Sequence, residues 1–172
     1  MPEPLLIPYR ELGFGGARPY LFLHVTGLDG RGRMIPGLID SGADSSVLPA
    51  GYAPLLGYSR RDLDRVEGTQ VGGSVTLLCA TRPSTAYIPE FPELAFEMAP
   101  FFVHGCQHAL WGRSDLMRHF DITISECRPE CLLVPAESAT WPLAPNTCGG
   151  AWPPAGSGPS VRAPVVLPVV RR

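Results

Sequence analysis

Short runs in which apolar and polar residues alternate recur along most of the chain and predict strands rather than long helices. Residues 19–28 alternate most regularly and predict a strand with one buried face. A turn at residues 28–32 follows, and residues 33–39 return as the second strand of a hairpin. We interpret Asp29 as a residue of this turn, because no buried apolar pair surrounds it.

Prolines and glycines divide the rest of this region into further short elements. Residues 4–9 predict an edge strand or a terminal arm. Additional strands are predicted at residues 46–48, 87–88, 94–98, 101–104, 109–111, 121–126 and 132–134. Short helices are predicted at residues 49–56, 59–66 and 116–120, the last of them capped by Ser114 or Asp115. The pattern predicts a mostly β domain.

Two extended arms around a glycine-rich tip are predicted over residues 66–78. The tip contains Val71, Gly72, Gly73 and Ser74. Glycine gives such a tip conformational freedom, so a flexible hairpin is expected, although an ordinary hairpin would have the same pattern.

The composition changes at residue 135, beyond which alanine, proline, glycine, serine and threonine dominate. This composition predicts little fixed structure through residue 160. Residues 161–170 are apolar but interrupted by prolines, and either add an edge strand or stay extended. We therefore expect one folded domain over residues 1–134 and a largely disordered, Pro- and Gly-rich tail over residues 135–172.

Composition and charge exclude several classes of function. A net charge of −2 gives no general attraction to nucleic acid or to anionic membranes. No apolar run reaches transmembrane length, and the N-terminal residues lack the pattern of a signal peptide. The five cysteines lack the dense spacing of a secreted disulfide scaffold. We expect a cytoplasmic protein that binds neither nucleic acid nor membrane.

The chemistry concentrates where the predicted strand of residues 33–39 ends. Asp40 follows this apolar run directly and is itself followed by Ser41 and Gly42. A carboxylate at the end of a buried strand is costly unless it is hydrogen-bonded, and the Ser41 hydroxyl and nearby backbone N–H groups could supply the bonds. A rigid, partly dry carboxylate beside donors suits acid–base chemistry on a peptide bond.

Two motifs resemble those of the retroviral-type (retropepsin-like) aspartic proteases. The first contains the catalytic-loop residues Asp40, Ser41, Gly42 and Ala43, preceded by two apolar residues and continued by residues 44–49. The second consists of Leu110, Trp111, Gly112 and Arg113 before a predicted helix. Trp111 is larger than the aliphatic residue that the resemblance leads us to expect. The resemblance covers residues 5 to about 134.

The resemblance implies a single-lobe acid-protease fold, which is a closed β barrel with a flap hairpin and one short C-terminal helix, active as a homodimer. Residues 71–74 would then be the part of the flap that contacts substrate. Asp44 and Arg113 would form an internal ion pair, in which Asp44 also meets the substrate backbone. The alternative is that both are solvated surface charges. Ser41 would bond across the dimer axis.

Aspartic proteolysis needs two carboxylates that share one proton. The chain has a single Asp-Ser-Gly motif, so the simplest source of the partner is Asp40 of a second copy. The dimer sheet could use residues 5–7 together with residues 122–124 or residues 165–170, and the sequence does not choose between them.

His104, Cys106 and His108 would share one face of a strand because they lie two residues apart. No acidic ligand lies nearby and no recognised zinc pattern is present, so we interpret them as polar strand-end residues. We predict no metal and no other cofactor.

The first hypothesis is therefore a homodimeric aspartic endopeptidase that acts on a peptide or protein substrate. The alternative is a catalytically silent retropepsin-like module that binds peptides or dimerises, since a fold does not guarantee chemistry. A third hypothesis is a dormant protease whose tail, residues 135–172, blocks the dimer contacts.

Overall fold

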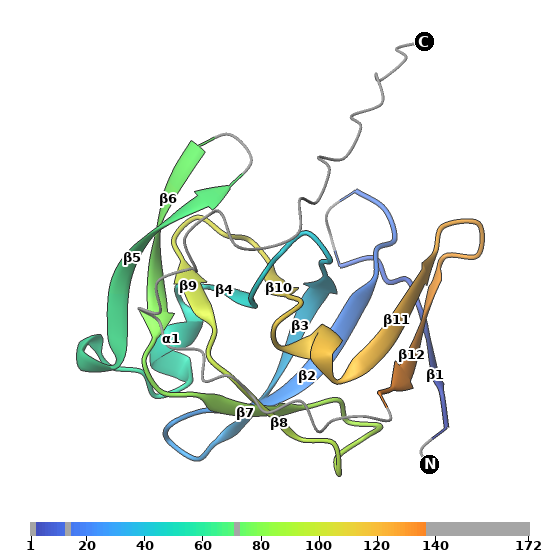
Figure 1. Ribbon diagram of the computed structural model, residues 1–172, viewed down its shortest axis with the longest axis horizontal. Helices are drawn as coiled ribbons and strands as arrows, with labels where there is room; N and C mark the ends of the chain where they lie inside the picture. Colours follow the sequence, from blue (N-terminus) through green and yellow to red (C-terminus); the bar gives the residue numbers. More distant parts are fainter. Residues whose placement is uncertain (1–2, 13–14, 71–72, 137–172) are drawn as a thin grey trace, which may run out of the picture.

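The structure is a computed structural model that describes residues 3–12, 15–70 and 73–136 of the chain (Figure 1). Val71 and Gly72 of the predicted flap tip lie outside the described residues, as do residues 137–172 of the predicted tail. The last strand described ends at Pro135.

Strands form most of the regular structure, which confirms the prediction of a mostly β domain. The strands are β1 Leu5–Pro8, β2 Tyr20–Thr26, β3 Gly32–Ile39, β4 Val47–Pro49, β5 Leu63–Gln70, β6 Gly73–Ala80, β7 Ser84–Tyr87, β8 Phe96–Met98, β9 Phe101–Val103, β10 Ala109–Trp111, β11 Phe120–Ser125 and β12 Glu130–Pro135. The helical segments are α1 Tyr52–Leu55, η1 Arg60–Asp62 and η2 Leu116–Arg118.

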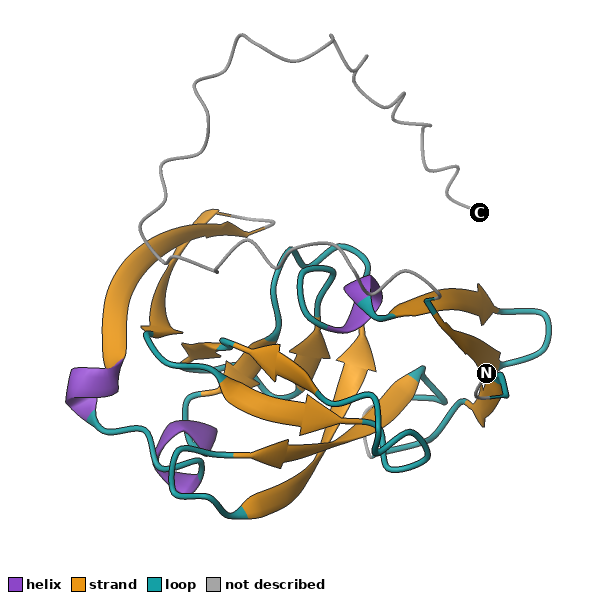
Figure 2. Cartoon of the chain, turned by 60° about the horizontal axis from the view of Figure 1, so that its bottom comes forward, coloured by secondary structure: helices purple, strands orange, loops and turns teal. Residues whose placement is uncertain are grey.

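Nine of these strands form one sheet in the order β5-β6-β9-β4-β10-β3-β2-β7-β8. Figure 2 shows that its strands cross over one another instead of lying flat. The alternation predicted for residues 19–28 is confirmed, because Leu21, Leu23 and Val25 of β2 are all buried. These side chains belong to the core that supports β3, the strand leading into Asp40.

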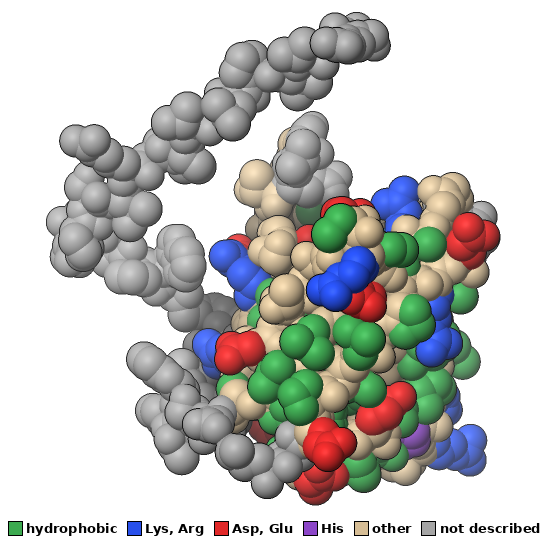
Figure 3. All heavy atoms as spheres, turned by 90° about the vertical axis from the view of Figure 1, so that its right-hand side faces the viewer, with side chains coloured by type: hydrophobic (Ala, Val, Ile, Leu, Met, Phe, Trp, Pro, Cys, Tyr) green, Lys and Arg blue, Asp and Glu red, His purple; other side chains and the backbone are tan. Residues whose placement is uncertain are grey.

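A second, three-stranded sheet has the order β1-β12-β11 and lies at the right of Figure 1. Figure 3 views the molecule from that side and shows hydrophobic side chains gathered on it. Leu6 of β1 is 55% exposed and Ile124 of β11 is 40% exposed. Within the chain, β1 pairs with β12 through contacts such as Leu5 with Leu133, and β11 lies on the other side of β12.

The predicted hairpin is formed by β5 and β6, which pair antiparallel from Leu63 with Ala80 to Gln70 with Gly73. The helix predicted at residues 59–66 is wrong beyond Asp62. Ser59 and Asp62 form a capping box that starts one helical turn, and the chain then enters β5. Pairing with β6 along the whole of β5 outweighs the local preference for helix.

The predicted helix at residues 116–120 is limited to the single turn of η2. Phe120 instead begins β11, where it is buried and stacks on Phe91 with ring centroids 5.7 Å apart. The cap predicted from Asp115 is also wrong, because its side chain makes no capping hydrogen bond. Similarly, the helix predicted at residues 49–56 is limited to α1, since Pro49 still belongs to β4.

Candidate active site

The loop after β3 fixes the carboxylate of Asp40 at the end of a buried strand. The Asp40 N–H donates to the carbonyl of Trp111 at 3.1 Å, and the Ala43 N–H donates to the Asp40 carbonyl at 3.2 Å. The Gly42 N–H donates to Oδ1 of Asp40 at 2.9 Å. A Cβ at Gly42 would lie 3.2 Å from the same oxygen, so glycine keeps this approach open. Asp40 is half-buried, whereas Ser41 and Gly42 are exposed.

The second predicted motif lies directly against this loop. Its strand, β10, runs between β3 and β4, and Leu110 is paired with Leu38 on one side and with Val47 on the other. A Cβ at Gly112 would lie only 2.4 Å from the carbonyl carbon of Ser45, so the two segments need glycine at this position. The structure thus brings residues 40–46 and 110–115 together, which are separate in the sequence.

Backbone hydrogen bonds continue this junction past Gly112. The Arg113 N–H donates to the Ala43 carbonyl at 3.0 Å, and the Ser114 N–H donates to the Asp44 carbonyl at 2.8 Å. The guanidinium of Arg113 contacts the carboxylate of Asp44. Their side chains are 58% and 81% exposed, so the pair adds little to folding stability. The pair joins the loop after β3 to the second motif.

Trp111 fills the core instead of lining the surface of the site. It is fully buried, and its indole N–H donates to the Leu21 carbonyl at 2.9 Å. A Cβ at Gly37 would lie 2.4 Å from Cε2 of the indole. The large side chain therefore fits because its neighbour on β3 is glycine, and it links β10 to β2.

Two buried polar residues at the junction were missed as site residues in the sequence. Asp115 is 2% exposed, and its Oδ2 accepts the Ser46 N–H at 2.7 Å. Ser46 is fully buried, and its hydroxyl oxygen accepts the Gly112 N–H at 3.2 Å. Burial raises the pKa of Asp115, although the Ser46 hydrogen bonds and the charge of Arg118 act in the opposite direction. No local sequence pattern predicts this contact, because Ser46 and Asp115 are 69 positions apart.

The described part of the predicted flap tip consists of Gly73 and Ser74, which are both exposed. Gly73 has a φ of 144°, a conformation that favours glycine. Ser74 is paired with Thr69 across the hairpin. In Figure 1 the described end of the hairpin and the loop after β3 both lie in the upper part of the molecule.

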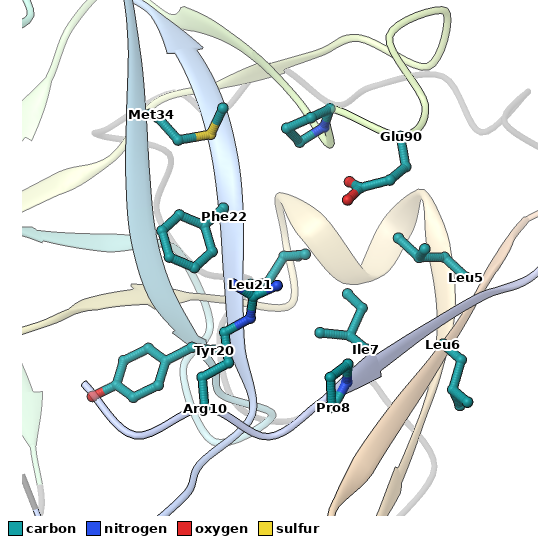
Figure 4. Close-up of a pocket in the computed structure, with 11 residues that line it drawn as sticks. Leu5, Leu6, Ile7, Pro8, Arg10, Tyr20, Leu21, Phe22, Met34 and Glu90 are labelled. Carbon is teal, nitrogen blue, oxygen red and sulfur yellow. The ribbon is translucent and has the colours of Figure 1, made fainter.

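A cavity of about 280 Å³ lies elsewhere, between β1 and β2 (Figure 4). Leu5, Ile7 and Phe22 contribute to its walls, and Arg10 and Glu90 add one charge of each sign. Its lining includes none of the residues predicted for catalysis or substrate binding. The cavity is therefore not part of the candidate active site.

Two of the three potential metal ligands at residues 104–108 make polar contacts with other groups. The Cys106 thiol donates to the His108 carbonyl at 2.9 Å, and the Tyr20 hydroxyl lies 3.3 Å from Nδ1 of His108. Within the described ranges, no three His, Cys, Asp or Glu side chains are grouped as metal ligands would be. A search of the same ranges also finds no helix that is long and apolar enough to cross a membrane.

This chain is similar to known proteins in sequence and in fold. The family model described as retroviral aspartyl protease matches residues 16–125. A solved structure of a retropepsin-like aspartic protease from Rickettsia conorii is similar, with 16% identity and a TM-score of 0.54, covering 76% of this chain and 90% of that one. The EIAV protease in complex with the inhibitor HBY-793 has 21% identity and a TM-score of 0.40, covering 60% of this chain and 88% of that one. No curated protein matches the chain.

Proposed function

This chain belongs to the retroviral aspartyl protease family, and from that premise we propose that it is an aspartic endopeptidase that acts as a homodimer. In this proposal Asp40 and the same residue of a second copy activate the water that attacks a peptide bond. The observation that carries the proposal is the position of Asp40 at the junction of both motifs, half-buried and beside the Gly42 N–H.

The second copy is needed because the sequence contains one Asp-Ser-Gly motif. Two carboxylates that share a proton must face each other, and a two-fold axis through the exposed Ser41 and Gly42 would place them so. Like charges at that distance resist ionising together, so one carboxylate stays protonated while the other is ionised. The two groups then have different roles in one step.

The ionised carboxylate takes a proton from water as the water oxygen bonds to the scissile carbonyl carbon. The protonated carboxyl gives its proton to the carbonyl oxygen, so the intermediate is a neutral diol. In the second step a carboxyl protonates the amide nitrogen, the C–N bond breaks, and the other carboxylate recovers a proton from the diol. The dyad ends as it began, with one shared proton.

An extended peptide would lie between the catalytic loop and the hairpin of β5 and β6, which opens to admit it. Gly73 and Ser74 are exposed at the described end of the hairpin and would contact the substrate there, with Val71 and Gly72. On the other side the Asp44 and Arg113 pair would orient the peptide backbone.

We also propose that the three-stranded sheet of β1, β12 and β11 contributes to the dimer contact. Leu6, which shares one face of this sheet with Leu132, is 55% exposed, and a second copy would cover it. Figure 3 shows hydrophobic side chains gathered on the side of the molecule where this sheet lies. The proposal predicts that Leu6→Asp weakens dimerisation, whereas Leu55→Asp, at an equally exposed leucine of α1, leaves it unchanged.

The direct test compares cleavage of a peptide library by the wild type and by Asp40→Asn, from acidic to neutral pH, while sedimentation monitors dimerisation. Asp29→Asn is the matched control, because it makes the same substitution at an aspartate that lies in an exposed turn. We expect cleavage by the wild type and the control, and none by an Asp40→Asn dimer.

A folded wild-type dimer without activity across that range would favour the silent peptide-binding module. Removal of residues 137–172 keeps β12 whole and tests the third hypothesis. A gain of activity after this truncation would indicate that the tail blocks the enzyme.

A further inference from the structure

We propose that Asp115 is a positioning residue of the active site, whose buried carboxyl holds Ser46 and thereby the loop that carries Asp40. This inference rests on the proposed function for its effect on catalysis. The contact itself is structural and can be measured without any substrate.

The contact closes the far end of the catalytic loop. At the near end, the Asp40 N–H donates to the Trp111 carbonyl at 3.1 Å. At the far end, just before β4, the Ser46 N–H donates to Oδ2 of Asp115 at 2.7 Å. Both partners belong to the segment that carries the second motif, so the loop is held at its two ends by one rigid neighbour.

Ser46 connects two groups in a space without solvent. Its backbone N–H donates to the Asp115 carboxyl, and its hydroxyl oxygen accepts the Gly112 N–H. Ser46 is fully buried and Asp115 is 2% exposed. Removal of the carboxyl would therefore leave a buried N–H without its acceptor, which the loop can correct only by moving.

A purely local role for Asp115 fits the structure poorly. Asp115 occupies the position before η2, yet its side chain makes no capping bond there. Burial of a carboxyl is costly, and burial raises the pKa of this one, so a serine or asparagine would start the helical turn at lower cost. The carboxyl oxygen accepts the Ser46 N–H in both protonation states, so an amide oxygen can replace it.

The test measures kcat and KM for Asp115→Ala and Asp115→Asn, with the fold checked by near-UV circular dichroism and the dimer by sedimentation. A displacement of about 1 Å in a catalytic group lowers the rate about 100-fold, so we expect kcat of Asp115→Ala to fall about 10- to 100-fold with KM within about threefold. Asp115→Asn keeps an acceptor and should retain kcat within about threefold.

Asp62→Ala is the matched control. Asp62 likewise accepts the backbone N–H of a serine, Ser59, at 3.0 Å, and it also bonds the Ser59 hydroxyl. This pair lies at η1 before the hairpin and not in the catalytic loop. We expect its kcat to stay within about twofold of the wild type, because the lost bond does not position Asp40.

Hydrogen exchange of the Ser46 amide, measured by NMR, separates this inference from the proposed function. We expect exchange at Ser46 to be at least about tenfold faster in Asp115→Ala and close to wild type in Asp115→Asn. If the wild type cleaves no peptide, the proposed function fails. Faster exchange of the Ser46 amide in Asp115→Ala than in the wild type would still show that Asp115 fixes the position of the loop.

Any of three results would overturn the inference. The first is an unchanged exchange rate of the Ser46 amide in Asp115→Ala, and the second is an unchanged kcat in that variant when it is folded. The third is an equal fall in kcat in Asp115→Ala and Asp115→Asn. If Asp115→Ala does not fold, the wild type decides, because a Ser46 N–H held by a buried carboxyl should be strongly protected from exchange, and exchange as fast as that of an exposed amide would refute the proposal.

Discussion

Replacement of Trp111 by phenylalanine tests whether the indole links β10 to β2 as the structure shows. The substitution removes the N–H that donates to Leu21 at 2.9 Å and shortens a ring that is fully buried against Gly37. A buried carbonyl that loses its donor costs about 1–2 kcal/mol. The space left by the shorter ring adds about 1–2 kcal/mol. We expect the free energy of unfolding to fall by about 3 kcal/mol.

The assay is urea denaturation followed by circular dichroism, with a thermal scan alongside. For a chain of this size, 3 kcal/mol corresponds to a fall in Tm of about 6–12 °C. Leu55→Ala is the control, because Leu55 is 52% exposed and its truncation should change stability by less than about 0.5 kcal/mol. A loss below about 1 kcal/mol in Trp111→Phe would refute the reasoning, since neither the hydrogen bond nor the packing would then matter.

Three further predictions concern the same framework. Gly112→Ala should cost about 3 kcal/mol or more in urea denaturation, because its Cβ would lie 2.4 Å from the Ser45 carbonyl carbon; a stable variant would contradict the close approach. Tyr58→Phe should cost about 1–2 kcal/mol, since the buried hydroxyl donates to the Arg82 carbonyl at 2.9 Å, and an unchanged midpoint would count against that bond. Burial raises the pKa of the Cys131 thiol from 9.0 to about 11, so the free energy of unfolding should decline as pH rises from 9 through 11, and Cys131→Val should lessen this decline; equal slopes would exclude the thiol as its cause.

The strands and the position of the catalytic loop could be predicted because their signals are local. Alternation identifies β2 directly, since Leu21 and Val25 point to the same buried face. Asp40 and Gly42 interact two residues apart, so an apolar run followed by this pair already describes the bond that the structure contains. The predicted hairpin was found for the same reason, with longer arms than expected.

The features that could not be predicted depend on distant partners. The polar start of residues 59–66 resembles a helix, and only the pairing of β5 with β6 shows that a strand begins at Leu63. Asp115 has the local pattern of a helix cap, but its acceptor is used by Ser46 on another loop. How the core accommodates the large Trp111 could not be predicted, because Gly37, which makes room for it, is far away in the sequence.

The central claim is that catalysis needs Asp40 from two copies, and a mixing experiment tests it most directly. Wild-type and Asp40→Asn chains are unfolded together in equal amounts, refolded so that they pair at random, and assayed at constant total protein. If the carboxylates are shared, only dimers of two wild-type chains are active, and these make up about a quarter of all dimers. The mixture then has about a quarter of the activity of a sample that contains the same total protein as wild type alone. If about half of the activity remains, each chain works without the Asp40 of its partner, and the account of a shared dyad is wrong.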